Sequence, residues 1–287
     1  MKKSQRTTSL IREEEDFNRK NFQEYLYQHL DWWPDGEIEV YQFTEGYSNL
    51  TYLIKCENHE IVMRRPPLGP LPPKAHDMGR EYHLLTKLNP VFSYAPKPFL
   101  LCEDETVIGS TFYVMEKKNG VVFDDDSEIG KNTTLEERKQ ISYAFVDTLA
   151  ELHQIDYNEV GLSDFGYPVG RIKRQVEGWI KRYNRSKTHE IKVFKEISEW
   201  FVNNIPKSHY TSIIHNDFKL NNMMFSESDY SKVVGVFDWE MSTIADPFVD
   251  LAIALGYWRE PNDPEPIKKS LPSLTSLPGF ISREEFV

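Results

Sequence analysis

Hydrophobic and polar positions alternate in several short stretches of the first part of the chain, and this alternation predicts β-strands. The stretches are Ile38–Phe43 and Leu50–Cys56, and a third strand pattern, Glu60–Arg64, follows. The second and third are separated by Asn58-His59, a pair typical of a tight turn, so we expect them to form a hairpin. The pattern therefore predicts a small antiparallel sheet.

Apolar side chains at helical spacing predict helices, most of them in the second half of the chain. The expected helices are Glu13–Leu30, Ala75–Leu88, one that follows the capping-box residues Thr133/Thr134 and runs through Leu152, Arg171–Tyr183, Ile191–Asn203 and Phe248–Trp258. The last is apolar throughout, which predicts a buried helix. Residues up to about Arg12 are expected to form a loose arm. Trp179, Tyr183 and Trp200 are interpreted as packing residues.

Composition narrows the class of protein. The 287 residues are 39% hydrophobic, which is enough for one large domain or two lobes with a real core. The net charge of −11 argues against nucleic acid or an anionic membrane as a partner. Cys56 and Cys102 cannot build a disulfide framework, and no secretory signal or membrane-length apolar run is visible. We therefore expect a soluble cytoplasmic protein and leave its oligomeric state open.

The candidate catalytic and metal-binding residues lie in the pattern His215-x-Asp217-x-x-x-x-Asn222 and at Asp238, which follows an apolar run. These residue types fit phosphoryl transfer from a nucleotide, which needs an oriented hydroxyl and divalent metal on the phosphates. Asp217 would accept or orient the hydroxyl proton, while Asn222 and Asp238 would offer oxygen ligands to Mg²⁺. Glu240 is a secondary candidate for the metal or for a residue that supports it.

Neighbouring residues support this interpretation. Met223–Phe225 and Val233–Phe237 flank a polar turn, so the motif leads into a β-hairpin whose second strand ends at the acids. His215 is expected to pin the loop backbone, and Asp250 to hold the same loop by hydrogen bonds. The alternative for Asp217 and Asp238 is a turn cap and a solvated strand end.

Two segments, H-N-D-F-K-L-N-N and F-D-W-E-M-S-T-I-A-D-P-F-V-D-L-A, resemble the aminoglycoside phosphotransferase family, relatives of the protein kinases. Within that family they resemble the branch fused to acyl-CoA dehydrogenases. The chain departs from the usual pattern at Asn216 and Ala245, where glycine is usual, at Asn221 for aspartate and at Lys219 for arginine. None of these removes a metal ligand or the base, and Lys219 could neutralise charge on the transferred phosphoryl group.

The resemblance covers about Ile38 to Val287 and implies an α+β, two-lobed protein-kinase-like fold. The expected parts are an N-terminal arm and helix (1–35), a nucleotide-binding antiparallel-sheet lobe (36–116) and a mainly helical catalytic lobe (117–287). Further helices usually follow in the family, so the chain is expected to be either naturally short or a fragment.

The resemblance also implies a nucleotide site. Ser48 and Asn49 lie in the hairpin that would cover the phosphates, although an ordinary turn is the alternative. Arg64 would form an ion pair with Glu81 that positions the phosphates; the alternative is a surface arginine. Met115 and Glu116 precede the hinge, where backbone groups would pair with the base.

The resulting hypothesis is a small-molecule kinase that uses ATP or GTP with Mg²⁺ to phosphorylate a hydroxyl group. By family analogy the acceptor is a hydroxyacyl thioester or an amino sugar, and the sequence does not choose between them. One alternative is a protein kinase, but a bounded activation segment is missing. The other alternative is a non-catalytic nucleotide-binding or scaffold protein.

Overall fold

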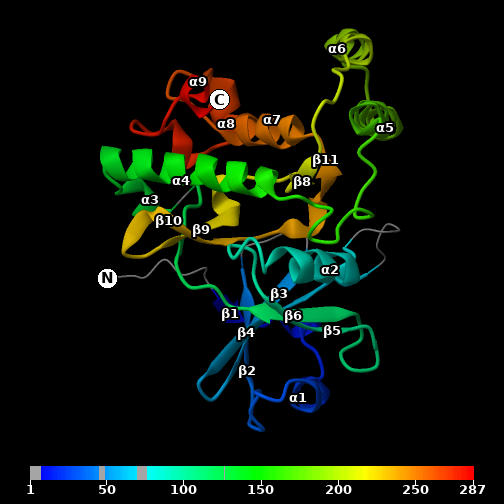
Figure 1. The fold of residues 1–287 in the computed structure, drawn as a ribbon, viewed down its shortest axis with the longest axis vertical. Coiled ribbons are helices and arrows are strands. Elements are labelled where there is room, and N and C mark those ends of the chain that lie inside the picture. The colour runs from blue at the N-terminus through cyan, green and yellow to red at the C-terminus, as the bar shows by residue number, and fades with distance from the viewer. Residues whose placement is uncertain (1–7, 45–48, 70–75, 126) are drawn as a thin grey trace.

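The computed structural model describes residues 8–44, 49–69, 76–125 and 127–287, which form two lobes (Figure 1). The smaller, N-terminal lobe is built on an antiparallel sheet, and the larger lobe is mainly helical, as expected. The lobes meet around α2 (Met78–Leu88) and the link that follows β6 (Phe112–Glu116).

The sheet of the N-terminal lobe has the order β1-β2-β3-β4-β6-β5, with antiparallel neighbours throughout. Its other strands are β1 (Thr8–Leu10), β2 (Glu39–Phe43), β3 (Leu50–Cys56), β4 (His59–Arg65) and β5 (Pro98–Cys102). Successive side chains point to opposite faces of a strand. Met63 therefore packs with α1 (Arg19–His29) on the outer face, while Val62 joins the core shared with α2 and the larger lobe.

Two expectations for the N-terminus were wrong. Within the expected loose arm, Thr8–Leu10 form a strand, β1, which pairs with β2 so that Thr8 lies opposite Phe43. The exposed edge of β2 offers unpaired backbone groups, which a short segment satisfies without needing an apolar pattern. The first helix also starts later than Glu13, because Asn18 caps it by accepting a hydrogen bond from the backbone of Asn21.

The larger lobe surrounds the long helix α4 (Leu135–Gln154), which starts at the capping box formed by Thr134 and Glu137. Its other helices are α3 (Glu128–Lys131), α5 (Arg171–Ser186), α6 (Lys192–Asn203), α7 (Pro247–Tyr257), α8 (Glu265–Ser270) and α9 (Arg283–Phe286). Its short strands are β7 (Val121–Val122), β8 (Ser212–Ile214), β9 (Met223–Ser226), β10 (Asp229–Val236) and β11 (Thr243–Ala245). They form two small sheets, ordered β10-β9-β7 and β11-β8.

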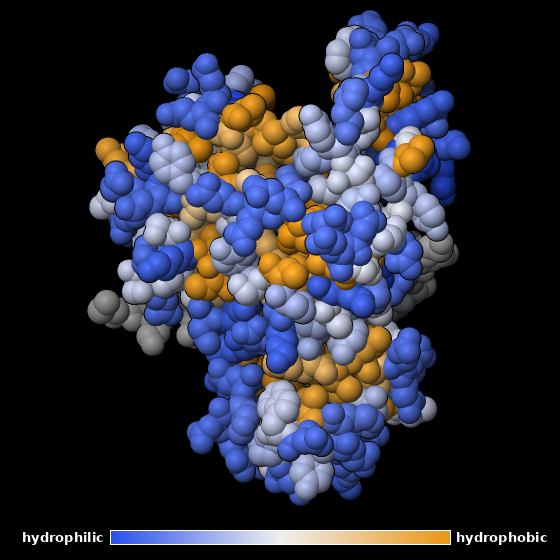
Figure 2. All heavy atoms as spheres, in the orientation of Figure 1, coloured by the Kyte–Doolittle hydropathy of each residue, from blue (hydrophilic) through white to orange (hydrophobic). Residues whose placement is uncertain are grey.

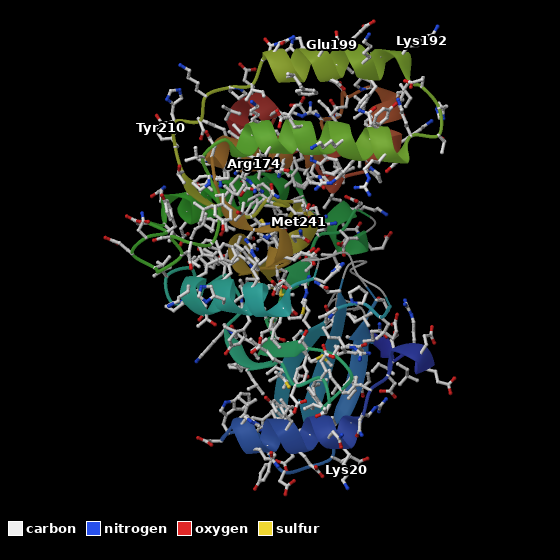
Figure 3. All side chains as sticks on the ribbon, turned by 90° about the vertical axis from the view of Figure 1, so that its right-hand side faces the viewer. Lys20, Arg174, Lys192, Glu199, Tyr210 and Met241 are labelled. Carbon is white, nitrogen blue, oxygen red and sulfur yellow. The ribbon has the colours of Figure 1, made fainter. Side chains whose placement is uncertain are left out.

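Burial of the apolar helices differs from the sequence-based expectation. In α7 only one side packs on the core, and Phe248 is 61% exposed. Helices α5 and α6 project from the lobe and run side by side (Figure 3), with apolar side chains between them (Figure 2). The expected packing residues Trp179 and Trp200 are 63% and 59% exposed, so only Tyr183, stacked on Phe194, packs as predicted. A single sequence shows that a helix is amphipathic, and it does not show what covers the apolar side.

No helix within the described ranges combines the length and the apolar composition that crossing a membrane requires.

Candidate active site

A cavity of about 730 Å³ lies between the lobes and gathers the residues that the sequence pattern selected. Its lining includes Asn49, Arg64, Glu81, Met115, Glu116, Asp217, Lys219, Asn222 and Asp238. Ser48, the remaining candidate, lies outside the described residues. Asn49 and Asp238, which are 189 positions apart in the chain, therefore line the same cleft.

The loop that carries Asp217 is held by a buried carboxylate. Asp250 in the first turn of α7 accepts hydrogen bonds from the backbone nitrogens of His215 and Asn216, both at 2.7 Å. The ring of His215 donates from Nε2 to the carbonyl oxygen of Phe237 at 2.8 Å. These contacts agree with the expected holding roles of His215 and Asp250.

The departure from glycine at Asn216 has a conformational reason. Asn216 has a φ of 67°, in the left-handed region that glycine adopts readily. Asparagine tolerates this region better than most other residues. The loop therefore keeps its shape although the family's usual glycine is absent.

Asp217 stands at the centre of a polar cluster. Lys219 Nζ lies 3.0 Å from Asp217 Oδ2, and Asn222 Nδ2 donates to the same oxygen at 3.1 Å. Burial disfavours the charge of Lys219, but the hydrogen bond and charge of Asp217 raise its pKa above the ordinary value. The ring of Tyr257 lies 5.2 Å from Lys219 Nζ. Lys219 therefore keeps its positive charge at neutral pH.

Asp238 follows the end of β10 and faces Arg64. Its backbone φ of 67° turns the chain sharply after the strand. Arg64 Nη2 donates to Asp238 Oδ1 at 2.7 Å. Burial opposes ionisation of Asp238, yet the charge and the hydrogen bond of Arg64 lower its pKa. The carboxylate is thus ionised and already paired.

Arg64 is shared by three carboxylates. Its side chain contacts Glu81 at 3.2 Å, so the predicted ion pair is present, and it also contacts Asp238 and, at 3.4 Å, Glu240. Strand alternation sends Arg64 into the cleft, while Arg65 points to the opposite face and donates to Tyr52 Oη. Burial raises the pKa of Glu81 to about 7, with Arg64 opposing the shift. Arg64 therefore compensates more negative charge than a single ion pair would require.

Asn49 and Glu240 connect the two lobes. Asn49 Nδ2 donates to Glu240 Oε2 at 2.6 Å, and His76 Nδ1 lies 2.8 Å from Asn49 Oδ1. The expected phosphate-binding residue Asn49 therefore makes a protein contact here. Sequence reasoning missed His76, because it follows a proline-rich segment and belongs to no motif.

Other residues missed by sequence reasoning lie behind the cluster. Tyr113 lies opposite Arg64 in the β4–β6 pairing and is fully buried. Burial, assisted by the negative charge of Glu81, raises its pKa well above the ordinary value. Tyr257, near Asp217, also has a pKa raised mainly by burial. Both looked like ordinary apolar positions of a strand and a helix, so no sequence signal marked them.

The hinge side of the cavity is formed by the end of β6. Glu116 Oε2 accepts from the backbone nitrogen of Lys97 at 3.1 Å and pairs with Lys118 at 3.0 Å. A Cβ at Gly120 would lie 2.3 Å from the carbonyl oxygen of Phe225. Only glycine allows this close approach, which brings the link between the lobes against the hairpin β9–β10.

The oxygen donors of the cleft suit Mg²⁺. Across the described residues, no group of three or more His, Cys, Asp or Glu side chains forms a self-contained metal site. Asn222 commits its nitrogen to Asp217, which leaves its side-chain oxygen to accept, and Asp238 adds a carboxylate. Mg²⁺ commonly takes one or two protein oxygens together with substrate phosphates, so this donor set fits the ion.

Comparison with known proteins identifies the family. Residues 39–271 match the family model described as the phosphotransferase enzyme family. Acyl-CoA dehydrogenase family member 11 of Gallus gallus is 35% identical over 88% of this chain and 32% of that protein. Family member 10 of Mus musculus is 34% identical over 82% of this chain and 22% of that protein. The chain thus spans about a third or less of the length of these relatives.

Solved structures give the same fold. A Ralstonia eutropha protein, solved as a candidate aminoglycoside phosphotransferase, has a TM-score of 0.76 and 29% identity over 94% of this chain and 78% of its own. The GDP and kanamycin complex of APH(2")-IIIa has a TM-score of 0.60 and 14% identity over 92% of this chain and 84% of its own. That second likeness shows the fold alone. The family match over residues 39–271 and the shared two-lobed, kinase-like architecture together show that this chain belongs to the phosphotransferase enzyme family.

Proposed function

We propose that this protein transfers the γ-phosphoryl group of ATP or GTP to a hydroxyl group of a small molecule, with Mg²⁺ as the cofactor. The observation that carries the proposal is the convergence of Asp217, Lys219, Asn222, Asp238 and Arg64 on one cleft of about 730 Å³. A cavity of this size accommodates a nucleotide together with part of an acceptor.

Each residue has a role that its contacts support. Asp217 accepts or orients the proton of the acceptor hydroxyl, because it is the carboxylate held by the pinned loop. Lys219, 3.0 Å from Asp217, orients that carboxylate and offers positive charge to the transferred group. Such positioning and charge stabilisation supply most of the catalysis in phosphoryl transfer.

The nucleotide side of the cleft uses the other lobe. Arg64 carries a planar, permanently charged fork, and Glu81 holds it at the base of the cleft. Met115, Glu116 and Asn49 line the cavity. In the proposed complex the base would pair with backbone groups near Met115 and Glu116, and Asn49 would lie near the phosphates. Asn222 and Asp238 would hold Mg²⁺, which neutralises phosphate charge when it is bound. The contacts of Arg64 with Asp238 and Glu240 would then be exchanged for contacts with phosphate.

We propose the acceptor only as a chemical class, a small molecule that carries a hydroxyl group. The neighbour solved with GDP and kanamycin binds an aminoglycoside, and the acyl-CoA dehydrogenase relatives suggest a hydroxyacyl thioester instead. A non-catalytic nucleotide-binding protein is the second candidate function. Asn49 donates one hydrogen of its side-chain amide to Glu240 Oε2, so at most one hydrogen remains to donate to a phosphate group.

Nucleotide binding and turnover test the proposal together. Thermal unfolding with ATP or GTP, with and without Mg²⁺, should show a Mg²⁺-dependent rise that Asp238→Asn removes. Asp217→Asn should lower phosphoryl transfer or slow hydrolysis by about 10²- to 10⁴-fold while the nucleotide-induced rise remains. Asp229→Asn, which removes a half-exposed carboxylate that pairs with Lys232 in the hairpin after the same loop, is the matched control.

The outcomes separate the two candidate functions. The non-catalytic function would be favoured if the wild type binds nucleotide but neither hydrolyses it nor transfers its phosphoryl group to a hydroxyl-bearing acceptor. Absence of any rise with either nucleotide would overturn both.

A further inference from the structure

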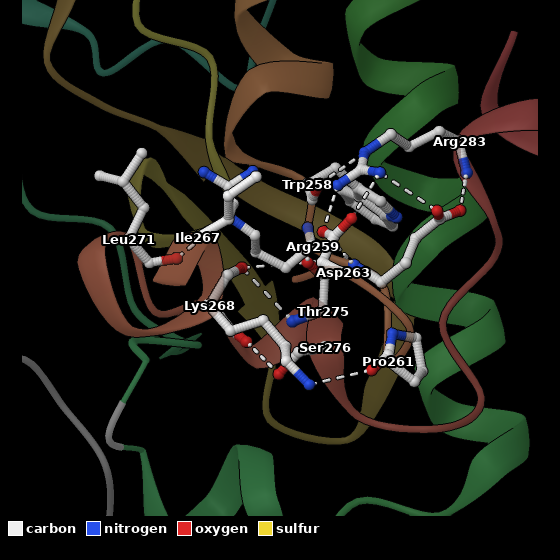
Figure 4. Close-up of polar contacts among 12 residues, drawn as sticks. Trp258, Arg259, Pro261, Asp263, Ile267, Lys268, Leu271, Thr275, Ser276 and Arg283 are labelled. Carbon is white, nitrogen blue, oxygen red and sulfur yellow. Dashed lines mark hydrogen bonds and ion pairs between the residues drawn. The ribbon is translucent and has the colours of Figure 1, made fainter. Parts of the chain in front are cut away.

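A second, smaller cavity lies beside the C-terminal segments of the larger lobe, outside the cluster around Asp217. Its volume is about 230 Å³, and its lining includes Lys131, Arg259, Lys268, Ser273 and Ser276. Figure 4 shows how Arg259, which follows α7, and Lys268 of α8 approach this region from different segments. No part of the proposed phosphoryl transfer uses these residues.

Arg259 is the unusual residue in this cavity. The residue is 5% exposed, so most of its side chain is out of contact with water, and it lines the cavity. Its Nε donates to the carbonyl oxygen of Leu271 at 3.1 Å, and its backbone nitrogen donates to Thr275 Oγ1 at 2.7 Å (Figure 4). Its two terminal nitrogens have no hydrogen bond or ion pair with any residue that the structure describes. Because the side chain is largely buried, an anion in the cavity would compensate its charge.

The neighbouring carboxylate does not supply that anion. Asp263 is engaged by Arg283, which donates to both of its oxygens, and the backbone nitrogen of Glu260 donates to it as well (Figure 4). The hydrogen bonds of Arg283, helped by the charge of Arg259, lower the pKa of Asp263. Arg259 thus feels the field of Asp263 without contacting it.

The remaining lining favours an anion of tetrahedral, phosphate-like form. Three cationic side chains and one carboxylate, Asp125, line the cavity. Lys268 also pairs with Glu265 at 2.7 Å and Lys131 with Glu128 at 3.5 Å, so of these three cations Arg259 is the one with no carboxylate contact among the described residues. Lys268 Nζ donates to the carbonyl oxygen of Pro261 at 3.0 Å, which holds it in place, and the hydroxyl groups of Ser273 and Ser276 add further polar groups. The planar fork of arginine matches two oxygens of a phosphate group.

We propose that the cavity at Arg259 and Lys268 binds a phosphate-class anion, either inorganic phosphate or the phosphate group of an ester. The terminal nitrogens of Arg259 donate to it, and Lys268 supplies a second charge. Asp125 also lines the nucleotide cleft, so the two cavities share a wall. The proposal does not depend on catalysis at the cleft.

The test is thermal unfolding with inorganic phosphate and, separately, with glycerol 2-phosphate, each at constant ionic strength set with chloride. A ligand that binds only the folded protein should raise the midpoint by about 5 °C at a hundred times its Kd. Arg259→Gln should abolish this rise, and Lys268→Ala should raise the apparent Kd about 3- to 10-fold. Lys269→Ala, which removes an exposed charge from the same helix, should leave it unchanged.

Phosphate bound in the nucleotide cleft is distinguished by Lys219→Ala, which should retain the rise that depends on Arg259. If Arg259→Gln does not fold, Lys268→Ala is the variant that tests the proposal. It should fold, because the Lys268 side chain contacts only the nearby residues Pro261 and Glu265. A rise with the ester alone supports the proposal and identifies an organic phosphate. Equal rises in wild type, Arg259→Gln and Lys268→Ala, or no rise beyond chloride with either probe, would overturn it.

Discussion

Removing Arg64 should destabilise the protein far more than removing Glu81, although the two side chains form one ion pair. Arg64→Met leaves Glu81, which is 2% exposed, without its cation and leaves Asp238 and Glu240 facing it. Breaking a buried pair in this way costs about 3–5 kcal/mol. Glu81→Gln leaves Arg64 paired with two carboxylates, so its cost should be that of one hydrogen bond, about 1 kcal/mol.

The double variant tests whether the cost of Arg64→Met comes from leaving the Glu81 carboxylate buried without a cation. With Arg64→Met and Glu81→Gln combined, the buried carboxylate is gone, so stability should recover by about 1–3 kcal/mol relative to Arg64→Met alone. Urea unfolding at pH 7, with EDTA and without nucleotide, measures all four proteins. Lys55→Met is the control, because Lys55 forms an exposed pair with Glu60 on the neighbouring strand and should cost at most about 1 kcal/mol.

The pH dependence has a defined sign. Burial raises the pKa of Glu81 from the ordinary 4.5 to about 7, so the folded state binds this proton more tightly than the unfolded state. The stability that Glu81 contributes is complete below about pH 4.5 and decreases by about 3 kcal/mol as the pH rises through 7. Glu81→Gln lacks this loss, so its cost relative to wild type should shrink with rising pH. A cost that equals that of Arg64→Met, or one that grows with pH, would refute the reasoning.

Three further predictions concern residues that hold the site or the core in place. Asp250→Asn should lose one of the two short hydrogen bonds to the backbone of His215 and Asn216. Turnover should then fall about tenfold or more, whereas nucleotide binding, measured by thermal shift, should persist. Gly120→Ala should reduce the free energy of unfolding by about 1–3 kcal/mol, because its Cβ would lie 2.3 Å from a backbone oxygen. Urea unfolding measures this, with Gly178→Ala as the control because a Cβ at Gly178 would have no neighbour within 4 Å. Phe286→Ala should cost about 3–5 kcal/mol in the same assay, because this buried ring packs on Phe145 and Trp258; a loss below about 1 kcal/mol would show that α9 is not part of the core.

The polar residues of the loop that carries Asp217 were readable from the sequence because their spacing is local. Asp217 and Asn222 sit five positions apart on one loop, and the hairpin that follows returns Asp238 to the same place. Short-range geometry is a property of the segment itself, so a pattern of residue types is enough to identify it. Strand alternation likewise distinguished Arg64 from Arg65, because adjacent side chains of a strand point to opposite faces of the sheet.

Burial of helices could not be read in the same way. The apolar sequence of α7 suggested a buried helix, yet Phe248 is exposed, and Trp179 and Trp200 are exposed on α5 and α6. An apolar pattern indicates that burial would stabilise a segment. Whether the segment is buried depends on which other elements pack against it in the folded protein.

Local spacing and family motifs were enough to predict the two lobes, the Arg64–Glu81 pair and the holding role of Asp250. Three-dimensional packing was needed to show that Arg64 serves three carboxylates, that Asn49 and His76 meet Glu240 across the lobes, and that Arg259 is buried without a carboxylate contact. Those contacts join residues that are far apart in the chain. Their electrostatics depend on burial and distance, which are defined only once the lobes have packed together.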